Sequence, residues 1–264
     1  HGRISKERYG CPGKFSRNRK IRKSFGMKTK FKFTFENLKK EYQLALDEGY
    51  ELLTCEEYVL KKRNLGPTTL VNRVDIDFSC KKAARLLDIF SELGIKATFF
   101  VRLHAPEYNP FSFENYRILK AIRDHGHELG YHSEIVDQEA VWGESAESCL
   151  KRDLSVLNSM LGIEVKGIAS HGGTTGLNNL DFWKTRDASE YGLLYEAYDE
   201  SPSFNLFKES FYVSDSEWTQ WKCYKYGNLI DGDNRSLSEH IKDKHPLVYL
   251  LIHPDTYFDL HFYE

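Results

Sequence analysis

The sequence has few cysteines, and no two of them stand close together in the sequence. The five cysteines among the 264 residues stand far apart and form no C-x-x-C motif. They are Cys11, Cys55, Cys80, Cys149 and Cys223. An odd and scattered set argues against a disulfide framework and against a cysteine-based structural zinc site. We therefore expect a protein of a reducing compartment and predict a cytoplasmic location.

Long apolar runs and a strong net charge are also missing. No stretch approaches the roughly 20 apolar residues that span a bilayer, and no basic start followed by an apolar segment suggests a signal peptide. The formal net charge of −2 gives no indication of an anionic partner. We expect no membrane span and no nucleic-acid partner, and we find no internal repeats.

One segment departs from the near-neutral charge of the whole chain. Residues 1–30 carry many Lys and Arg side chains and a single acid, Glu7. Such a segment is typical of a solvated arm, and the alternative is a surface for phosphate, nucleic acid or anionic lipid. It holds no base-reading motif and no interleaved aromatic residues for single-strand binding. We interpret 1–30 as a basic N-terminal arm and 31–264 as a single domain.

The rest of the chain alternates between helical and strand patterns. Apolar residues at helical spacing, closed by a glycine, predict helices over 79–94, 112–126 and 147–162. Short apolar runs predict strands over 96–101, 127–132, 165–170 and 247–253. The segment 174–245 is less legible, with possible strands at 192–198 and 211–215 and a helix at 236–243. This rhythm predicts βαβ units and a parallel sheet or barrel.

The stretch NRVDIDFS, residues 72–79, places two acids inside a strand pattern. Asp is a poor strand former, and side chains two residues apart point to the same side of a strand. Arg73, Asp75 and Asp77 therefore share one face. The other face is apolar and is predicted to be core, with Val74, Ile76 and Phe78. The charged face either lies on an exposed edge or lines a site.

Histidines follow three of the other predicted strands at the point where each strand ends. They are His132, His171 and His253. In parallel α/β folds the carboxyl ends of the strands meet at the edge where ligands bind and catalysis occurs. Asp and His together suit zinc and other borderline divalent ions. We therefore expect the acids and the histidines to form one site.

The segments that carry these residues resemble a known family. VDIDFSCKKAARLLDIFSELGIKATFFVRLH, then RDHGHELGYHSE and the later LIHP, resemble the polysaccharide deacetylase (NodB-homology) family, most closely the branch linked to lipopolysaccharide and O-antigen biosynthesis. The resemblance covers residues 70–172 and the last strand. It implies an α/β fold, a distorted (β/α) barrel with fewer than eight regular strands. It also implies a metal-dependent hydrolase that removes an acyl group from an amino sugar of a cell-surface polysaccharide or its precursor. Acetyl is the first candidate for this acyl group.

The resemblance also implies roles for four residues. Asp75 would be the general base and Asp77 a metal ligand. His132 would be a second ligand, and His253 would be the general acid for the departing amine. The implied cofactor is a divalent ion, with zinc as the first candidate. The implied partner is a carbohydrate: an N-acylated sugar, a polysaccharide or a sugar nucleotide.

The sequence departs from the family pattern at the third ligand. The usual second histidine of this motif is replaced by Val136. We expect His171 to take its place, with Glu134 second and Asp137 as a further candidate. Supporting residues are expected to be Arg73, which could hold Asp75 ionised, and Gly172, which could let substrate approach the backbone.

The same departure keeps two other classes of function open. The second class is a weakened or inactive barrel that binds a glycan or a sugar nucleotide without hydrolysing it. The third is a nucleic-acid or membrane-surface protein led by the basic arm. Stoichiometric metal separates the first two classes, and salt-dependent binding that needs residues 1–30 would indicate the third.

Overall fold

The computed structural model describes residues 31–260. The predicted basic arm lies outside the described residues, so its boundary at residue 30 stays a prediction. The strands of the described part are β1 (Glu51–Leu53), β2 (Thr69–Ile76), β3 (Thr98–Val101), β4 (Glu128–Ser133), β5 (Gly167–Ser170), β6 (Tyr195–Glu196), β7 (Phe211–Ser214), β8 (Lys222–Lys225), β9 (Asn228–Leu229) and β10 (Leu247–Ile252). Its α-helices are α1 (Phe35–Asp47), α2 (Cys55–Lys61), α3 (Cys80–Leu93), α4 (Phe113–Asp124), α5 (Ile135–Trp142), α6 (Ala146–Leu161), α7 (Leu206–Glu209) and α8 (Leu237–Lys242).

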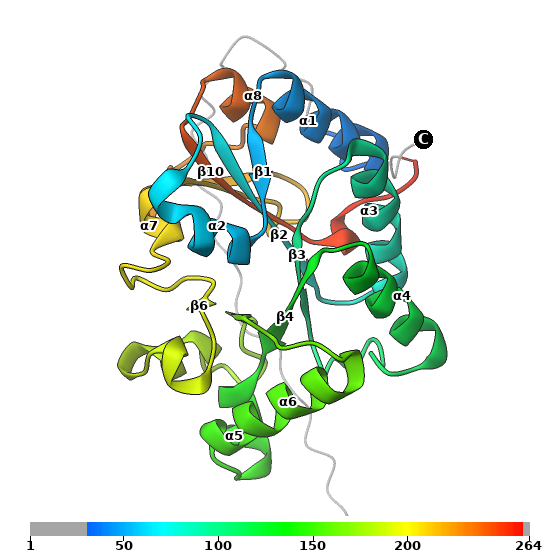
Figure 1. Cartoon of the computed structure of the whole chain (residues 1–264), viewed down its shortest axis with the longest axis vertical. Coiled ribbons are helices and arrows are strands. Elements are labelled where there is room, and N and C mark those ends of the chain that lie inside the picture. The colour runs from blue at the N-terminus through cyan, green and yellow to red at the C-terminus, as the bar shows by residue number, and fades with distance from the viewer. Residues whose placement is uncertain (1–30, 261–264) are drawn as a thin grey trace, which may run out of the picture. The chain divides into compact units, whose positions relative to one another are not determined.

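One curved run of parallel strands organises these elements (Figure 1). The hydrogen-bonded order β6-β5-β4-β3-β2-β10-β7 contains seven strands, and each neighbouring pair is parallel. Within residues 31–260 no pairing joins β6 to β7, and β8 and β9 extend the β7 edge as an antiparallel ribbon. The short β1 pairs parallel to β2 beside this run. The α/β fold and the distorted, incompletely closed barrel are thus confirmed.

Strand β2 lies inside this run, between β3 and β10, and is buried along its whole length. Its two faces separate two cores, as the alternation of strand side chains requires. Val74 and Ile76 belong to the larger apolar cluster. Val71 faces the other way into a smaller cluster rich in tyrosine and phenylalanine. The charged face of β2 is therefore interior, which excludes the exposed-edge interpretation of the two acids.

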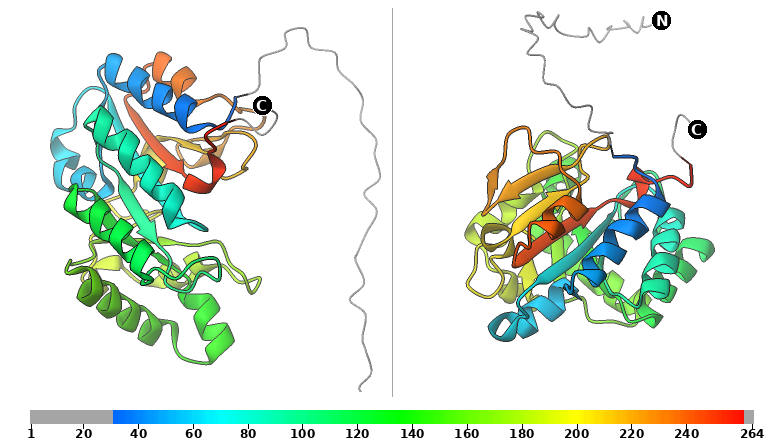
Figure 2. Two further views of the ribbon diagram at one scale, coloured as in Figure 1. Left: turned by 90° about the vertical axis from the view of Figure 1, so that its right-hand side faces the viewer. Right: turned by 90° about the horizontal axis from the view of Figure 1, so that it is seen from above.

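Helices form a layer over one face of the sheet (Figure 2, left). Helices α3, α4 and α6 correspond to the predicted ones, each with a serine cap at its start. Gly94 and Gly162 end α3 and α6 with φ of 66° and 62°, a left-handed conformation that glycine adopts without strain. Among the described helices, none has both the length and the apolar character needed to cross a bilayer.

The less legible segment contains the predicted elements in shortened form. The candidate strand at 192–198 is only the two-residue β6, and those at 211–215 and 236–243 correspond to β7 and α8. One core prediction was wrong. Phe78 is 39% exposed, because β2 ends at Ile76 and the chain turns before Phe78 toward the start of α3.

Candidate metal centre and active site

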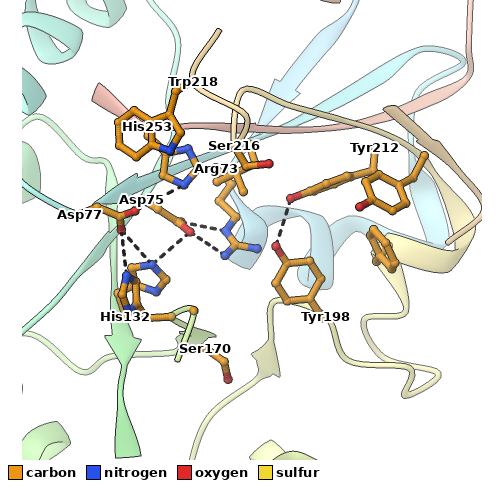
Figure 3. A pocket seen from close by; sticks show the side chains of 15 residues that line it. Arg73, Asp75, Asp77, His132, Ser170, Tyr198, Tyr212, Ser216, Trp218 and His253 are labelled. Carbon is orange, nitrogen blue, oxygen red and sulfur yellow. Dashed lines mark hydrogen bonds and ion pairs between the residues drawn. The ribbon is translucent and has the colours of Figure 1, made fainter. Parts of the chain in front are cut away.

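Polar side chains from four parallel strands meet at the carboxyl edge of the sheet (Figure 3). Asp75 lies on β2 and Asp77 directly follows it, while His132 lies on β4. His171 follows β5 and His253 follows β10. The strand order places these ends side by side, since β10, β2, β3, β4 and β5 are consecutive neighbours. The predicted convergence of acids and histidines is therefore present in the structure.

Asp77, His132 and His171 form a group in this site that could hold a metal ion. One potential ligand atom from each lies within 4.8 Å of the other two. Asp77 Oδ1 is 3.2 Å from His132 Nε2 and 4.0 Å from His171 Nε2. Asp77 Oδ1 is buried, and it accepts no hydrogen bond of good geometry from the described residues. A buried carboxylate oxygen facing two imidazole nitrogens is a donor set that fits zinc or a similar divalent cation.

The tautomer of His132 supports this fit. Its Nδ1 lies 2.9 Å from the carbonyl oxygen of Ala169, so Nδ1–H donates there and Nε2 faces the two acids. Metal-binding histidines commonly use this arrangement. Burial alone would lower the pKa of His132, but Asp75 and Asp77 raise it above its usual value. The site thus favours positive charge at Nε2, which a proton or a metal ion can supply.

Asp75 is held by a buried arginine on its own strand. Arg73 donates from Nε to Asp75 Oδ1 at 2.8 Å and from Nη2 to Oδ2 at 2.7 Å, and both side chains are almost completely buried. Burial alone would raise the pKa of Asp75, but Arg73 and His132 outweigh it and hold this pKa below its usual value. Asp75 is therefore a fixed, ionised carboxylate 3.3 Å from His132 Nε2.

The guanidinium of Arg73 lies between two aromatic rings. Its central carbon is 5.3 Å from the Phe100 ring centroid and 4.8 Å from that of Tyr198. Gly130 on β4 makes room for Phe100, since a Cβ at this position would lie 2.4 Å from the phenyl ring. The two rings fix the arginine and so fix Asp75.

His253 is oriented by a residue that the sequence analysis did not select. Asp215, at the end of β7, accepts a hydrogen bond from His253 Nδ1 at 2.6 Å and another from its backbone N at 2.9 Å. Burial alone would lower the pKa of His253, but Asp215 raises it to about 9. The free Nε2 is 3.7 Å from Asp77 Oδ2. Nε2–H of a protonated His253 is therefore available to donate a proton into the site.

Glu134 and Asp137, the other candidates for the third ligand, are engaged elsewhere. Glu134 Oε1 accepts from Arg102 Nη2 at 2.7 Å and lies 3.3 Å from His171 Nδ1, and these two neighbours lower its pKa to about 2 although burial opposes this. Glu134 thus positions His171. Asp137 accepts from Thr175 and Asn179 and fastens the loop after β5. It does not belong to the group around Asp77.

A cavity of about 310 Å³ opens beside these residues. Gly172 lies in its wall, with open space where a Cβ would be. The aromatic residues of the wall come from the segment 174–245. They are Tyr198, Phe207, Tyr212, Trp218 and Tyr224. Trp218 stacks on His253 with ring centroids 5.9 Å apart, and its backbone is left-handed, with φ of 61°. The cavity is large enough for a sugar ring and presents aromatic faces that suit one.

Two residues of the site could have been found from sequence signals. Asp215 follows the apolar run FYVS just as the histidines follow their strands, so the rule for strand ends applied to it as well. Arg102 directly follows β3 and donates from Nη1 to the backbone oxygen of Asp77 at 2.9 Å. No sequence signal marks Trp218, because its position depends on a turn between β7 and β8.

Comparisons with known proteins give similarities at the level of structure. No family model matches the chain, and no curated protein matches it. The chain is similar to the deacetylase PplD of Streptococcus pyogenes in complex with acetate, at 20% identity and a TM-score of 0.42 over 51% of this chain and 61% of that one. It is similar to a family 4 carbohydrate esterase from Bacillus anthracis, at 19% identity and a TM-score of 0.41 over 77% and 84%.

A third similar structure is a mutant of BA3943, described as a family 4 pseudoenzyme with restored enzymatic activity. The identity is 16% and the TM-score is 0.43, over 73% of this chain and 62% of that one. The chain spans less than two thirds of the length of PplD and of BA3943. All three TM-scores are below 0.5, so the description of the fold rests on the strand order.

Proposed function

We propose that this chain is a metal-dependent hydrolase that removes an acyl group from an N-acylated amino sugar, with acetyl as the first candidate for this group. The observation that carries the proposal is the buried Asp77 Oδ1, which faces His132 and His171 beside two further buried pairs, Asp75 with Arg73 and His253 with Asp215. Each of these parts meets one requirement of amide hydrolysis: a cation site, a proton acceptor and a proton donor.

The roles of the residues follow from their positions. Asp77, His132 and His171 would hold the divalent ion, which we propose to be zinc. Such an ion lowers the pKa of a water molecule to about 7 and polarises a carbonyl group. Asp75, kept ionised by Arg73, would accept the proton of the attacking water. His253 would donate the proton at Nε2 to the departing amine nitrogen, while Asp215 holds the ring in place.

The substrate class follows from the resemblance and the cavity. We propose a cell-surface polysaccharide or its precursor, including a sugar nucleotide, as in the branch linked to lipopolysaccharide and O-antigen biosynthesis. The aromatic wall with Trp218 supports a sugar ring as the ligand. A cytoplasmic location remains part of the proposal, and the four described cysteines, all free and buried, are compatible with it.

We expect the purified chain to release a carboxylic acid from an N-acylated sugar only when metal is bound. The assay measures acetate or another acid from a panel of N-acylated sugars and sugar nucleotides, before and after chelation and after zinc is restored. Loss on chelation and recovery with zinc would support the proposal. A chain that binds these sugars but holds no stoichiometric metal at the Asp77 group and releases no acid would instead belong to the glycan-binding alternative that Val136 motivates.

We also expect His253→Ala to keep its metal and to lose turnover. A proton donor to the leaving group contributes about 10²–10⁴-fold in rate, whereas the group around Asp77 stays intact. Acid release and metal content would be measured on the same samples. Asp215→Asn is a milder variant, because it leaves the imidazole in place. It should lower the rate of acid release by less than His253→Ala does. Equal turnover in His253→Ala and the parent would remove His253 from the mechanism.

A further inference from the structure

A second group of imidazole and carboxylate side chains lies at the opposite end of β7 from the site. Asp215 follows the last residue of β7, and Phe211 is its first. Beside Phe211 lie His240 on α8 and His245 just before β10, and Asp243 directly follows α8. One ligand atom from each of these three lies within 4.8 Å of the other two. The proposed hydrolase uses none of them.

Phe211 holds both imidazole rings of this group. Its ring is stacked on His245 with centroids 4.0 Å apart and an interplanar angle of 11°. It also packs on His240 at 4.7 Å, with an angle of 38°. His240 is completely buried. The two rings are thus placed by packing, as a preformed binding site requires.

Within residues 31–260, each of the two histidines has a buried ring nitrogen without a hydrogen-bond partner, and that of His245 lies 3.9 Å from Asp243 Oδ2. His240 Nδ1 and His245 Nε2 are buried and have no hydrogen-bond partner among the described residues. The other ring nitrogen of His240, Nε2, lies 3.2 Å from Cys223 Sγ. When Nε2–H donates to this sulfur, Nδ1 carries a lone pair, and metal-binding histidines are commonly fixed by such a second contact. A buried polar atom without a partner needs an explanation, and a bound ion is one that fits two such imidazole nitrogens beside a carboxylate.

The charge around the group admits a cation. Arg235 donates to Asp233 from Nε at 3.0 Å and to Asp243 from Nη1 at 2.6 Å, so two carboxylates share one guanidinium. Lys225 also acts on His245, so two cations face two carboxylates around the group. Because Arg235 competes with a cation for Asp243, we expect the group to bind the cation with moderate affinity.

We propose that His240, Asp243 and His245 form a second site for a divalent cation of the zinc type, which ties the end of α8 to the start of β10. Two imidazoles and one carboxylate are a ligand set that zinc accepts. Ligand atoms around tetrahedral zinc lie about 3.4 Å apart, so the three side chains would close by roughly 1 Å from their present spacing. Asp243 is exposed, and it gives the ion a route from solvent.

Equilibrium dialysis of the full chain against Zn²⁺ tests the second site. We expect two ions per chain in the parent and one in His245→Gln, which should keep its acid-release activity. Asp77→Asn should also bind one ion, now at the second site, and adding zinc to it should raise its Tm by about 5–10 °C at hundredfold excess over Kd. The double variant should bind none.

The control is His125→Gln, an exposed histidine at the end of α4 that belongs to neither group and should keep two ions. Asp243→Asn provides a milder second variant, since it leaves both buried rings in place. Unchanged zinc stoichiometry in both His245→Gln and Asp243→Asn would overturn the second site. Zinc stoichiometry of one in the parent, abolished by Asp77→Asn, would overturn it as well while leaving the proposed hydrolase intact.

Discussion

Replacing Asp75 with asparagine should lower the rate of acid release by about 10²–10⁴-fold while the ion at the Asp77 group stays bound. Asparagine keeps the shape of the side chain and can still accept a hydrogen bond from Arg73, but it cannot take a proton from water. Asp75 is also outside the group of three that offers the ligand atoms. Turnover and zinc content, measured on the same preparation, separate these two effects.

The substitution has a second consequence that the experiment must separate from the first. Arg73 is 1% exposed, and without the charge of Asp75 it becomes a buried cation with less compensation. Breaking a buried ion pair in this way costs about 3–5 kcal/mol of stability. Thermal unfolding therefore accompanies the assay, which is run well below the Tm of the variant. Asp88→Asn, an exposed acid on α3, is the matched control. A folded Asp75→Asn variant with parental activity would show that the acid pair is structural.

Asp77→Asn should fail differently from Asp75→Asn, although the two residues are neighbours on one strand face. Asp77 supplies the carboxylate of the proposed cation site, and its loss removes a ligand rather than a base. Removing a group that only supports a ligand costs about 10–100-fold in metal affinity, so we expect a loss of more than about 100-fold here. Excess zinc should restore part of the turnover.

His132→Ala is the companion variant, because it removes the imidazole on the other side of the same site. Both variants would be compared with the parent by zinc titration in the His245→Gln background, so that an ion at the second site does not contribute. Full occupancy of the Asp77 group in both variants would exclude this assignment of the ligands. Zinc that binds normally to His171→Ala would in turn leave Glu134 or water as the third ligand.

Much of the site was predictable because it depends on local patterns. Apolar runs predict strands, and an acid or a histidine just after such a run predicts a position at the carboxyl edge of a parallel sheet. Asp77, His171 and His253 follow this rule, and Asp75 and His132 each occupy the last position but one of their strand. The rule also applied to Asp215, which was missed because β7 lies in a segment with weak periodicity.

Other features depended on contacts between distant segments. Val136 left the third position beside Asp77 open to His171, Glu134 or Asp137, and spacing alone did not choose among them. The structure brings His171 to the group around Asp77. Arg102 engages Glu134, and the loop after β5 engages Asp137. Phe78 was assigned to the core by alternation, which fails once the strand ends.

Periodicity over a few residues was enough to predict the parallel α/β architecture, the helices α3, α4 and α6, and the acids and histidines at the strand ends. The tertiary structure alone decided which side chains pair. The placement of β7 beside β10 gives His253 its partner Asp215, and the same strand brings Phe211 against His240 and His245 at its other end. Such pairings depend on strand order and side-chain packing, which connect residues that are far apart in the chain.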